Sequence, residues 1–419
     1  MSLEERTMNR RAVEALRNGV PNRDAVRAMG CDQPEIEGLF RWHLQDAAGD
    51  VHEESRNGGM IVSGEFGAGK SHLLEYLEHV ALEERFVCSR IVVSKETPLF
   101  DPVKLYRAAI ESAVVPGRRG GAMTEIAASL GFDRESYREL RRWVHQDAGL
   151  NARFAATLSV FERMHNDPEV SNRIIRFWSG DRIGSGEIKR YLRACRESAK
   201  YKIESVVARE LALQSFRFAP RLMKAAGYAG WALLIDEAEL IGRYTLNQRA
   251  KSYAELARWT GKLDEPRFAG LTAVVAITED FHSKIIECNK DLEKITGRLR
   301  EKNKEAELLL ANQAERGIQA IQGDFVRLKT PDRIALDKTY EKARAIHAAA
   351  YNWNPPPVET VERLLTTRMR QYIKGWITEW DLKRLDALYQ PDIAVEKLEQ
   401  DYTEDRNLEI EPEQNDPAA

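Results

Sequence analysis

The sequence contains little cysteine and no long hydrophobic run. Its four cysteines are far apart among 419 residues, and no two form a CxxC pair, which argues against a zinc knuckle or a disulfide framework. No apolar run approaches the roughly 18–20 residues that a membrane-spanning helix needs. The polar start, Met1 to Arg6, lacks the apolar stretch of a signal peptide. We therefore expect a cytoplasmic protein with no membrane partner.

The sequence also lacks a charge imbalance. Lys and Arg total 63, Asp and Glu total 66, and the net charge is -3, so any contact with nucleic acid requires a local basic face. The candidates are Arg118–Arg119 and the stretch from Arg138 to Arg142, for which a solvated helical surface is the alternative interpretation. The eight histidines show no HExxH spacing, so no zinc site is predicted.

Short apolar segments separated by helical patterns predict an α/β fold. The predicted strands cover residues 60–63, 86–93, 231–235 and 271–277, with a short fifth strand at 325–328. Because these strands are apolar throughout, they indicate a parallel sheet that is covered on both faces.

The length allows two or three structural units, and the patterns divide the chain into four parts. We expect an N-terminal helical segment (1–55), an α/β core (56–330) with a helical insertion at about 117–205, a C-terminal helical lid (331–390) and a tail (391–419). From Asp392 onward ten acidic residues face two basic ones, which is typical of a disordered tail.

The segment after the first predicted strand carries a phosphate-binding motif. Gly64-Glu65-Phe66-Gly67-Ala68-Gly69-Lys70-Ser71 matches G-x-x-x-x-G-K-[ST], the Walker A pattern, and an amphipathic helix follows at His72. Backbone N–H groups and the helix N-terminus would cradle phosphates, Lys70 would pair with the β/γ-phosphates, and the Ser71 hydroxyl would bind Mg²⁺. No N-K-x-D sequence lies in a suitable position, which favours ATP over GTP.

Two carboxylates end the third predicted strand. Asp236 and Glu237 follow Trp231-Ala232-Leu233-Leu234-Ile235, an arrangement that resembles a Walker B motif. Asp236 would hold Mg²⁺ through its water shell, while Glu237 would orient and deprotonate the attacking water. Two solvated acids at a strand end are the alternative.

The order of these motifs resembles the AAA+ class and its relatives among the additional-strand P-loop ATPases. The resemblance implies that Thr278, at the end of the fourth strand, senses the γ-phosphate. It also implies that Arg298 or Arg300 acts as an arginine finger on a neighbouring subunit of a homo-oligomer, and that Arg368 or Arg370 contacts phosphate from the lid. Solvated helix faces and a strand-capping hydroxyl are the alternatives.

A more specific resemblance is to the BrxD-like ATP-binding proteins of BREX bacteriophage-exclusion systems. It is carried by Arg10 to Asn22, Ser94 to Leu99, Val114 to Gly120 and Arg370 to Leu382. The resemblance implies an anti-phage role beside other BREX proteins, in which ATP turnover remodels a DNA or protein complex. The alternatives are a replication-initiator-like DNA-loading ATPase, a signalling NTPase and a non-hydrolysing ATP-binding scaffold.

Overall fold

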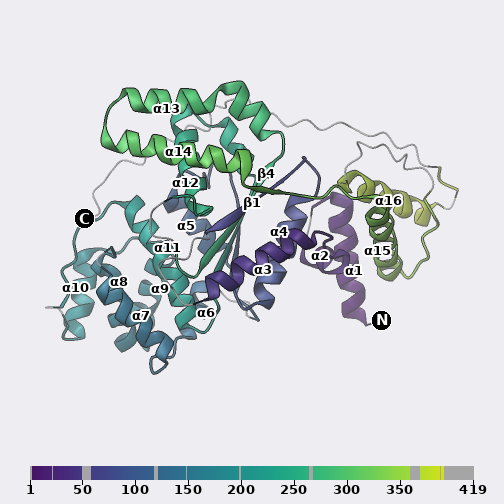
Figure 1. The fold of residues 1–419 in the computed structure, drawn as a ribbon. Coiled ribbons are helices and arrows are strands. Elements are labelled where there is room, and N and C mark those ends of the chain that lie inside the picture. Colours follow the sequence, from purple (N-terminus) through teal and green to yellow (C-terminus); the bar gives the residue numbers. More distant parts are fainter. Residues whose placement is uncertain are drawn as a thin grey trace.

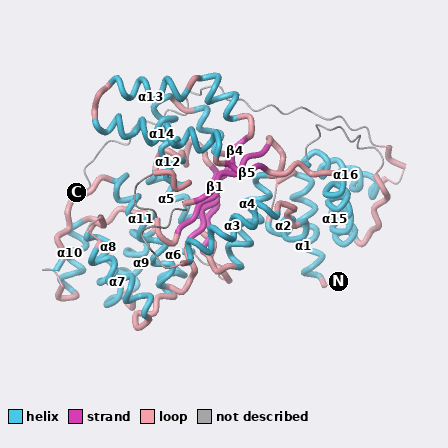
Figure 2. Tube along the Cα trace, viewed as in Figure 1, coloured by secondary structure: helices cyan, strands magenta, loops and turns pink. Residues whose placement is uncertain are grey.

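The computed structural model describes residues 2–20, 22–49, 58–117, 121–147, 149–197, 200–263, 268–358, 369–386 and 388–390. Within these ranges the chain forms a mixed α/β structure in which helices surround a central sheet (Figures 1 and 2). This arrangement confirms the predicted fold class at the level of a P-loop NTPase-like core.

The described strands form one fully parallel sheet. They are β1 (Gly59–Gly64), β2 (Val87–Val92), β3 (Trp231–Asp236), β4 (Leu271–Thr278) and β5 (Phe325–Arg327). Their spatial order is β2-β3-β4-β1-β5, and every neighbouring pair is parallel. All five predicted strands are confirmed. β4 therefore lies between the strand that leads into the glycine-rich loop and the strand that ends in carboxylates.

Helices cover both faces of the sheet. α3 (Pro34–Ala48) and α4 (Lys70–Glu83) pack on one face, and α5 (Pro102–Glu111), α11 (Ala208–Ala225) and α12 (Leu246–Trp259) contribute to the core on the other. Along β3, Leu233 and Ile235 face one core, whereas Leu234 faces the other. Because side chains alternate between faces along a strand, a strand buried on both sides must be apolar at every position.

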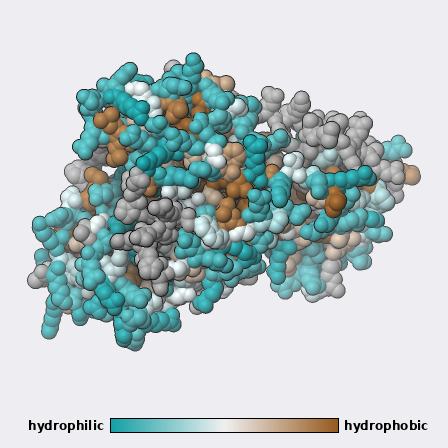
Figure 3. Space-filling model, viewed as in Figure 1, coloured by the Kyte–Doolittle hydropathy of each residue, from teal (hydrophilic) through white to brown (hydrophobic). Residues whose placement is uncertain are grey.

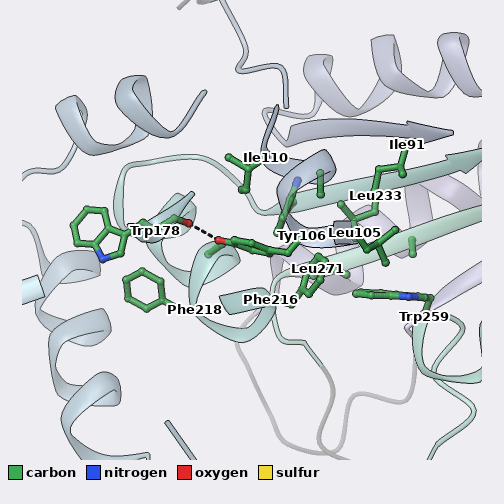
Figure 4. Packing of buried hydrophobic residues seen from close by; sticks show 14 of the residues in the cluster. Ile91, Leu105, Tyr106, Ile110, Trp178, Phe216, Phe218, Leu233, Trp259 and Leu271 are labelled. Atoms are coloured by element: carbon green, nitrogen blue, oxygen red, sulfur yellow. Dashed lines mark hydrogen bonds between the residues drawn. The ribbon is translucent and has the colours of Figure 1, made fainter. Parts of the chain in front are cut away.

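Five α-helices lie between α5 and α11 in the described part of the chain. They are α6 (Ala122–Ala128), α7 (Glu135–Gln146), α8 (Ala152–Met164), α9 (Pro168–Trp178) and α10 (Ser185–Ala194). Their apolar residues continue the core of the adjacent sheet face. The Tyr106 hydroxyl of α5 donates a 2.6 Å hydrogen bond to the Trp178 carbonyl of α9, while its ring packs edge-on against Phe216 (Figure 4). These contacts attach α9 to the layer that covers the sheet.

A second helical excursion joins β4 to β5. It consists of a π-helical turn η3 (His282–Glu287) and the antiparallel pair α13 (Asp291–Glu301) and α14 (Glu305–Gly323). α14 packs closely on α12, where a Cβ atom at Gly317 would lie 1.9 Å from the Tyr253 carbonyl oxygen. Only glycine permits this approach of the two backbones.

The remaining helices come from opposite ends of the described chain and form one lobe. α1 (Leu3–Asn18), α2 (Arg23–Met29), α15 (Arg333–Tyr351) and α16 (Met369–Leu385) share a hydrophobic core that includes Val13, Ile346 and Trp380 (Figure 1). We call these four helices the terminal lobe. Gly19, in a left-handed conformation, ends α1, and the Asn22 side chain accepts a 2.7 Å hydrogen bond from the Ala25 N–H to begin α2.

The visible surface is mostly hydrophilic, and hydrophobic residues form small separate patches on it (Figure 3). Among the described residues, no helix is both long enough and apolar enough to cross a membrane.

Candidate nucleotide-binding site

The glycine-rich loop joins the end of β1 to the start of α4. β1 ends at Gly64 and α4 begins at Lys70. Gly67 and Gly69 have φ angles of 79° and 107°, a region that glycine occupies without a Cβ clash. The first N–H groups of α4 have no partner within the helix and carry the positive end of its dipole, so this turn suits an anion.

The Lys70 side chain is folded back over its own loop. Its Nζ donates to the carbonyl oxygens of Gly64 and Glu65, at 3.1 and 3.3 Å. The same Nζ lies 4.0 Å from an Oε of Glu239. The ammonium group is therefore buried among oxygen atoms. To bind phosphate oxygens, it would have to leave these contacts.

The two predicted carboxylates differ in their surroundings. Asp236, the last residue of β3, is buried, and its Oδ1 accepts a 3.0 Å hydrogen bond from the Glu237 N–H. Glu237 is exposed and has φ 56°, a left-handed conformation that is uncommon for a non-glycine residue. Burial and the nearby Asp236 raise the pKa of Glu237, while Lys70 and Arg370 act in the opposite direction.

A third carboxylate, which we did not single out from the sequence, joins this group. Glu239 lies in the 3₁₀ turn η2 (Ala238–Arg243), is 3% exposed, and has an Oε2 with no hydrogen-bond partner. Burial raises the pKa of Glu239 to about 7; Lys70 opposes that shift, and Asp236 and Glu237 add to it. The available signal was the third acid of Asp236-Glu237-Ala238-Glu239, but sequence alone does not show that its side chain turns inward.

These groups line a cavity of about 650 Å³ between the sheet and the terminal lobe. Phe66 to Leu73 of the loop and α4 form one wall, together with Asp236, Glu237 and Glu239. The opposite wall contains the end of α1, residues 29–34, residues 328–332, and side chains of α15 and α16. Gly64 and Glu65 do not line the cavity; their carbonyl groups hold Lys70 instead.

Hydrogen bonds join the two walls. His72 Nε2 donates a 2.8 Å hydrogen bond to the Gly30 carbonyl oxygen, which can only accept, and burial lowers the pKa of His72. On the lobe side, Lys342 of α15 donates a 2.7 Å bond to the Met29 carbonyl. The connection between α2 and α3 is thus held by both α4 and α15. These contacts were not predictable from sequence, because they join segments up to 313 residues apart.

Arg370 is the lid candidate that the structure places at the cavity. It lies in the first turn of α16, lines the cavity, and donates from Nε to the Gly19 carbonyl at 2.9 Å. Its positive charge opposes the rise in the Glu237 pKa. The other candidate, Arg368, lies outside the described residues.

The proposed metal ligands lie in one wall. Ser71, in the first turn of α4, and Asp236 both line the cavity and offer hydroxyl and carboxylate oxygens. Such oxygen ligands suit Mg²⁺, which is commonly held by few protein ligands and completes its shell with water and phosphate oxygens. The residues present therefore fit a magnesium–nucleotide complex.

The weaker candidates lie outside the cavity wall. Thr278 is buried at the end of β4, where it pairs in register with Gly64. Arg298 and Arg300 are exposed on α13, and Arg300 forms a 2.8 Å ion pair with Glu315 of α14. Their roles as sensor and finger remain predictions.

The basic stretch on α7 is partly neutralised. Arg138 and Arg142 both pair with Glu135, and Arg141 pairs with Glu162. Arg118 and Arg119 lie outside the described residues.

Comparisons with known proteins identify the family. The chain matches the family described as BREX system ATP-binding protein BrxC/D over residues 6–377. No curated protein and no solved structure matches it. The match includes the glycine-rich loop, the β3 carboxylates and most of the terminal lobe, so it confirms the resemblance seen in the sequence. The chain belongs to the BrxC/D family of BREX system ATP-binding proteins.

Proposed function

We propose that this protein binds and hydrolyses ATP within a BREX-type anti-phage system and couples turnover to remodelling of a DNA or protein complex. One observation carries the proposal: Lys70, Ser71, Asp236 and Glu237 line a single cavity that is closed on its other side by the terminal lobe. Family membership supports the ATP-binding part and implies that other BREX components are its partners.

The AAA+-like assignment is the finer part of this proposal. The strand order β2-β3-β4-β1-β5 inserts β4 between the loop strand and the acidic strand, as expected for an additional-strand P-loop ATPase. We assign residues 331–390 as the lid and residues 117–205 as a helical insertion in the core. Since α1 and α2 share the core of α15 and α16, the first two helices would move with the lid.

The residues divide the catalytic work by position. Backbone N–H groups of the loop and α4 bind the phosphates, and Lys70 leaves the Gly64 and Glu65 carbonyls to neutralise transferred charge. Glu237, exposed at the cavity with a raised pKa, orients water and accepts its proton. Held by Ser71 and Asp236, Mg²⁺ would offset the negative charge of the phosphates.

The terminal lobe could transmit the state of the nucleotide to a bound partner. Arg370 lies on the lobe side of the cavity, and its charge acts on Glu237 from α16. When the γ-phosphate leaves, its attraction for Arg370 is lost, which changes the balance between an open and a closed lobe. The protein would thereby transmit turnover to a bound complex.

DNA association is supported by one face of α10. Lys189 and Arg193 are exposed four residues apart on α10, and neither has a carboxylate partner among the described residues. Cations four residues apart on a helix lie on one side, where they could contact successive phosphates. This face is a better candidate than α7, whose arginines are paired with glutamates.

An ATPase assay with and without duplex DNA tests the proposal, with Lys70→Ala as the blank. Wild type should hydrolyse ATP, and Glu237→Gln should retain ATP while losing roughly 10²–10⁴-fold in turnover. If wild type binds ATP but never turns it over, the protein is a scaffold. Stimulation of hydrolysis by DNA favours a function on DNA, either remodelling or loading, over that of a signalling NTPase.

A further inference from the structure

Glu239 is a buried carboxyl group with an unsatisfied oxygen atom in the nucleotide cavity. The residue is 3% exposed, lines the cavity, and leaves Oε2 without a hydrogen bond. A buried acceptor without a donor costs free energy. This cost requires an explanation, because an apolar side chain at this position would leave no unpaired oxygen atom buried.

The nearest cation to this carboxyl is Lys70. Nζ of Lys70 lies 4.0 Å from Oε1 of Glu239, and both side chains are almost fully buried. Two charges at this separation attract each other several times more strongly near a protein interior than in bulk water. Glu237 differs from Glu239 in being exposed, so the two acids have different surroundings although they are two residues apart.

We propose that Glu239 is a positioning residue that holds Lys70 against its own loop, so that an incoming nucleotide must draw the ammonium away from this carboxylate. The inference rests on the proposed function, because it concerns the same cavity. Lys70 then has two positions: one against the Gly64 and Glu65 carbonyls and Glu239, and one against phosphate. Glu239 stabilises the first and therefore weakens nucleotide binding.

The first test needs no nucleotide. In the empty protein, Lys70 is labelled with an amine-acylating reagent and the modified peptide is quantified by mass spectrometry. Glu239→Gln should speed labelling at Lys70 roughly fivefold, because loss of the carboxylate frees the amine and lowers its pKa. Glu75→Gln is the matched control, since Glu75 is a buried carboxyl of α4 that pairs with Arg90 instead. Equal labelling in wild type and Glu239→Gln overturns the inference.

The second test measures binding of Mg²⁺–ADP by calorimetry at pH 8. Glu239→Gln should bind roughly fivefold more tightly than wild type, whereas Glu75→Gln should match wild type. Unchanged or weaker binding by Glu239→Gln overturns the inference while leaving the proposed function intact. Absence of binding by wild type would instead refute the proposed function.

One further variant and one combination of results complete the tests. If Glu239→Gln folds poorly, Glu239→Asp, whose carboxylate is one methylene shorter, should shift both readouts in the same direction by a smaller factor. A direct repulsion between Glu239 and phosphate would tighten ADP binding without changing the labelling of Lys70 in the empty protein. That combination would also overturn the inference.

Discussion

Gln33 and Lys329 hydrogen-bond to each other twice. The Gln33 side-chain amide donates to the Lys329 carbonyl at 3.0 Å, and its oxygen accepts from the Lys329 N–H at 2.9 Å. Gln33 precedes α3 and Lys329 lies between β5 and α15, so the pair joins the two connections between sheet and terminal lobe. Both residues also line the nucleotide cavity.

This pair predicts a role for Gln33 in keeping the lobe in place over nucleotide. Gln33→Ala should raise the Kd for ATP roughly fivefold, since each lost hydrogen bond contributes about 1 kcal/mol or less. Gln33→Glu keeps the acceptor for the Lys329 N–H but turns a carboxylate oxygen toward the Lys329 carbonyl and adds negative charge to the cavity lining, so it should weaken binding at least as much. Calorimetry with Mg²⁺–ATP measures both. Wild-type affinity in Gln33→Ala would show that the two connections hold their geometry without this side chain.

The α10 face yields a prediction about DNA. Replacing Lys189 and Arg193 by glutamate should lower duplex-DNA affinity by roughly tenfold or more and flatten its salt dependence by about two units. The matched control is the double replacement of Arg138 and Arg142 by glutamate, which changes net charge equally on α7. Fluorescence anisotropy across a salt series measures both. Equal losses in the two variants would show that net charge, not the α10 face, governs binding.

Glu239 makes the stability of the empty protein depend on pH. Burial raises the pKa of Glu239 from its ordinary 4.5 to about 7, so between these values the folded state binds more protons than the unfolded state. Stability therefore falls as pH rises through this window. Melting curves from pH 5 to 8 should show Glu239→Gln gaining roughly 2 °C on wild type by pH 8. Parallel curves for the two proteins would contradict the prediction.

The close contact between α14 and α12 predicts that replacing Gly317 by alanine destabilises the protein much more than replacing Gly297. Gly317→Ala places a methyl group 1.9 Å from the Tyr253 carbonyl oxygen, so the helices must separate and the free energy of unfolding should fall by about 2 kcal/mol or more. Gly297→Ala, in α13, meets nothing within 4 Å and should be neutral or stabilising by up to about 1 kcal/mol. Denaturant unfolding compares them. Equal stability of the two variants would mean that α14 shifts without cost.

The sequence predicted what is encoded locally. The five strands could be located because each short apolar run is buried on both faces, as β3 shows with Leu233 and Leu234. The glycine-rich loop and the Asp236-Glu237 pair were predictable because each directly follows a short apolar strand. In a parallel sheet, the C-terminal ends of such strands lie at the same edge. Local signals also bound α2, since Asn22 caps its start and Gly30 its end, and both residue types are favoured at these positions.

Features that depend on distant contacts could not be predicted in this way. Nothing in residues 1–29 shows that α1 and α2 pack with α15 and α16. The apolar face of an amphipathic helix does not specify which other helix will cover it. The cavity wall made by Gln33, Lys342 and Arg370 follows from that pairing. The burial of Glu239 depends on the path of η2 after β3, which the local pattern does not determine.

The shared core of the terminal lobe has a consequence for biosynthesis. Val13 and Leu16 of α1 are buried with Trp376 and Ile377 of α16, which the ribosome adds more than 350 residues later. At about 5–20 residues per second, the part of α1 that packs on α15 and α16 stays uncovered for tens of seconds. The wall opposite Lys70 is completed only when α16 emerges, so a nascent chain lacks the full nucleotide cavity until then, and a chaperone that shields α1 would protect it during that interval.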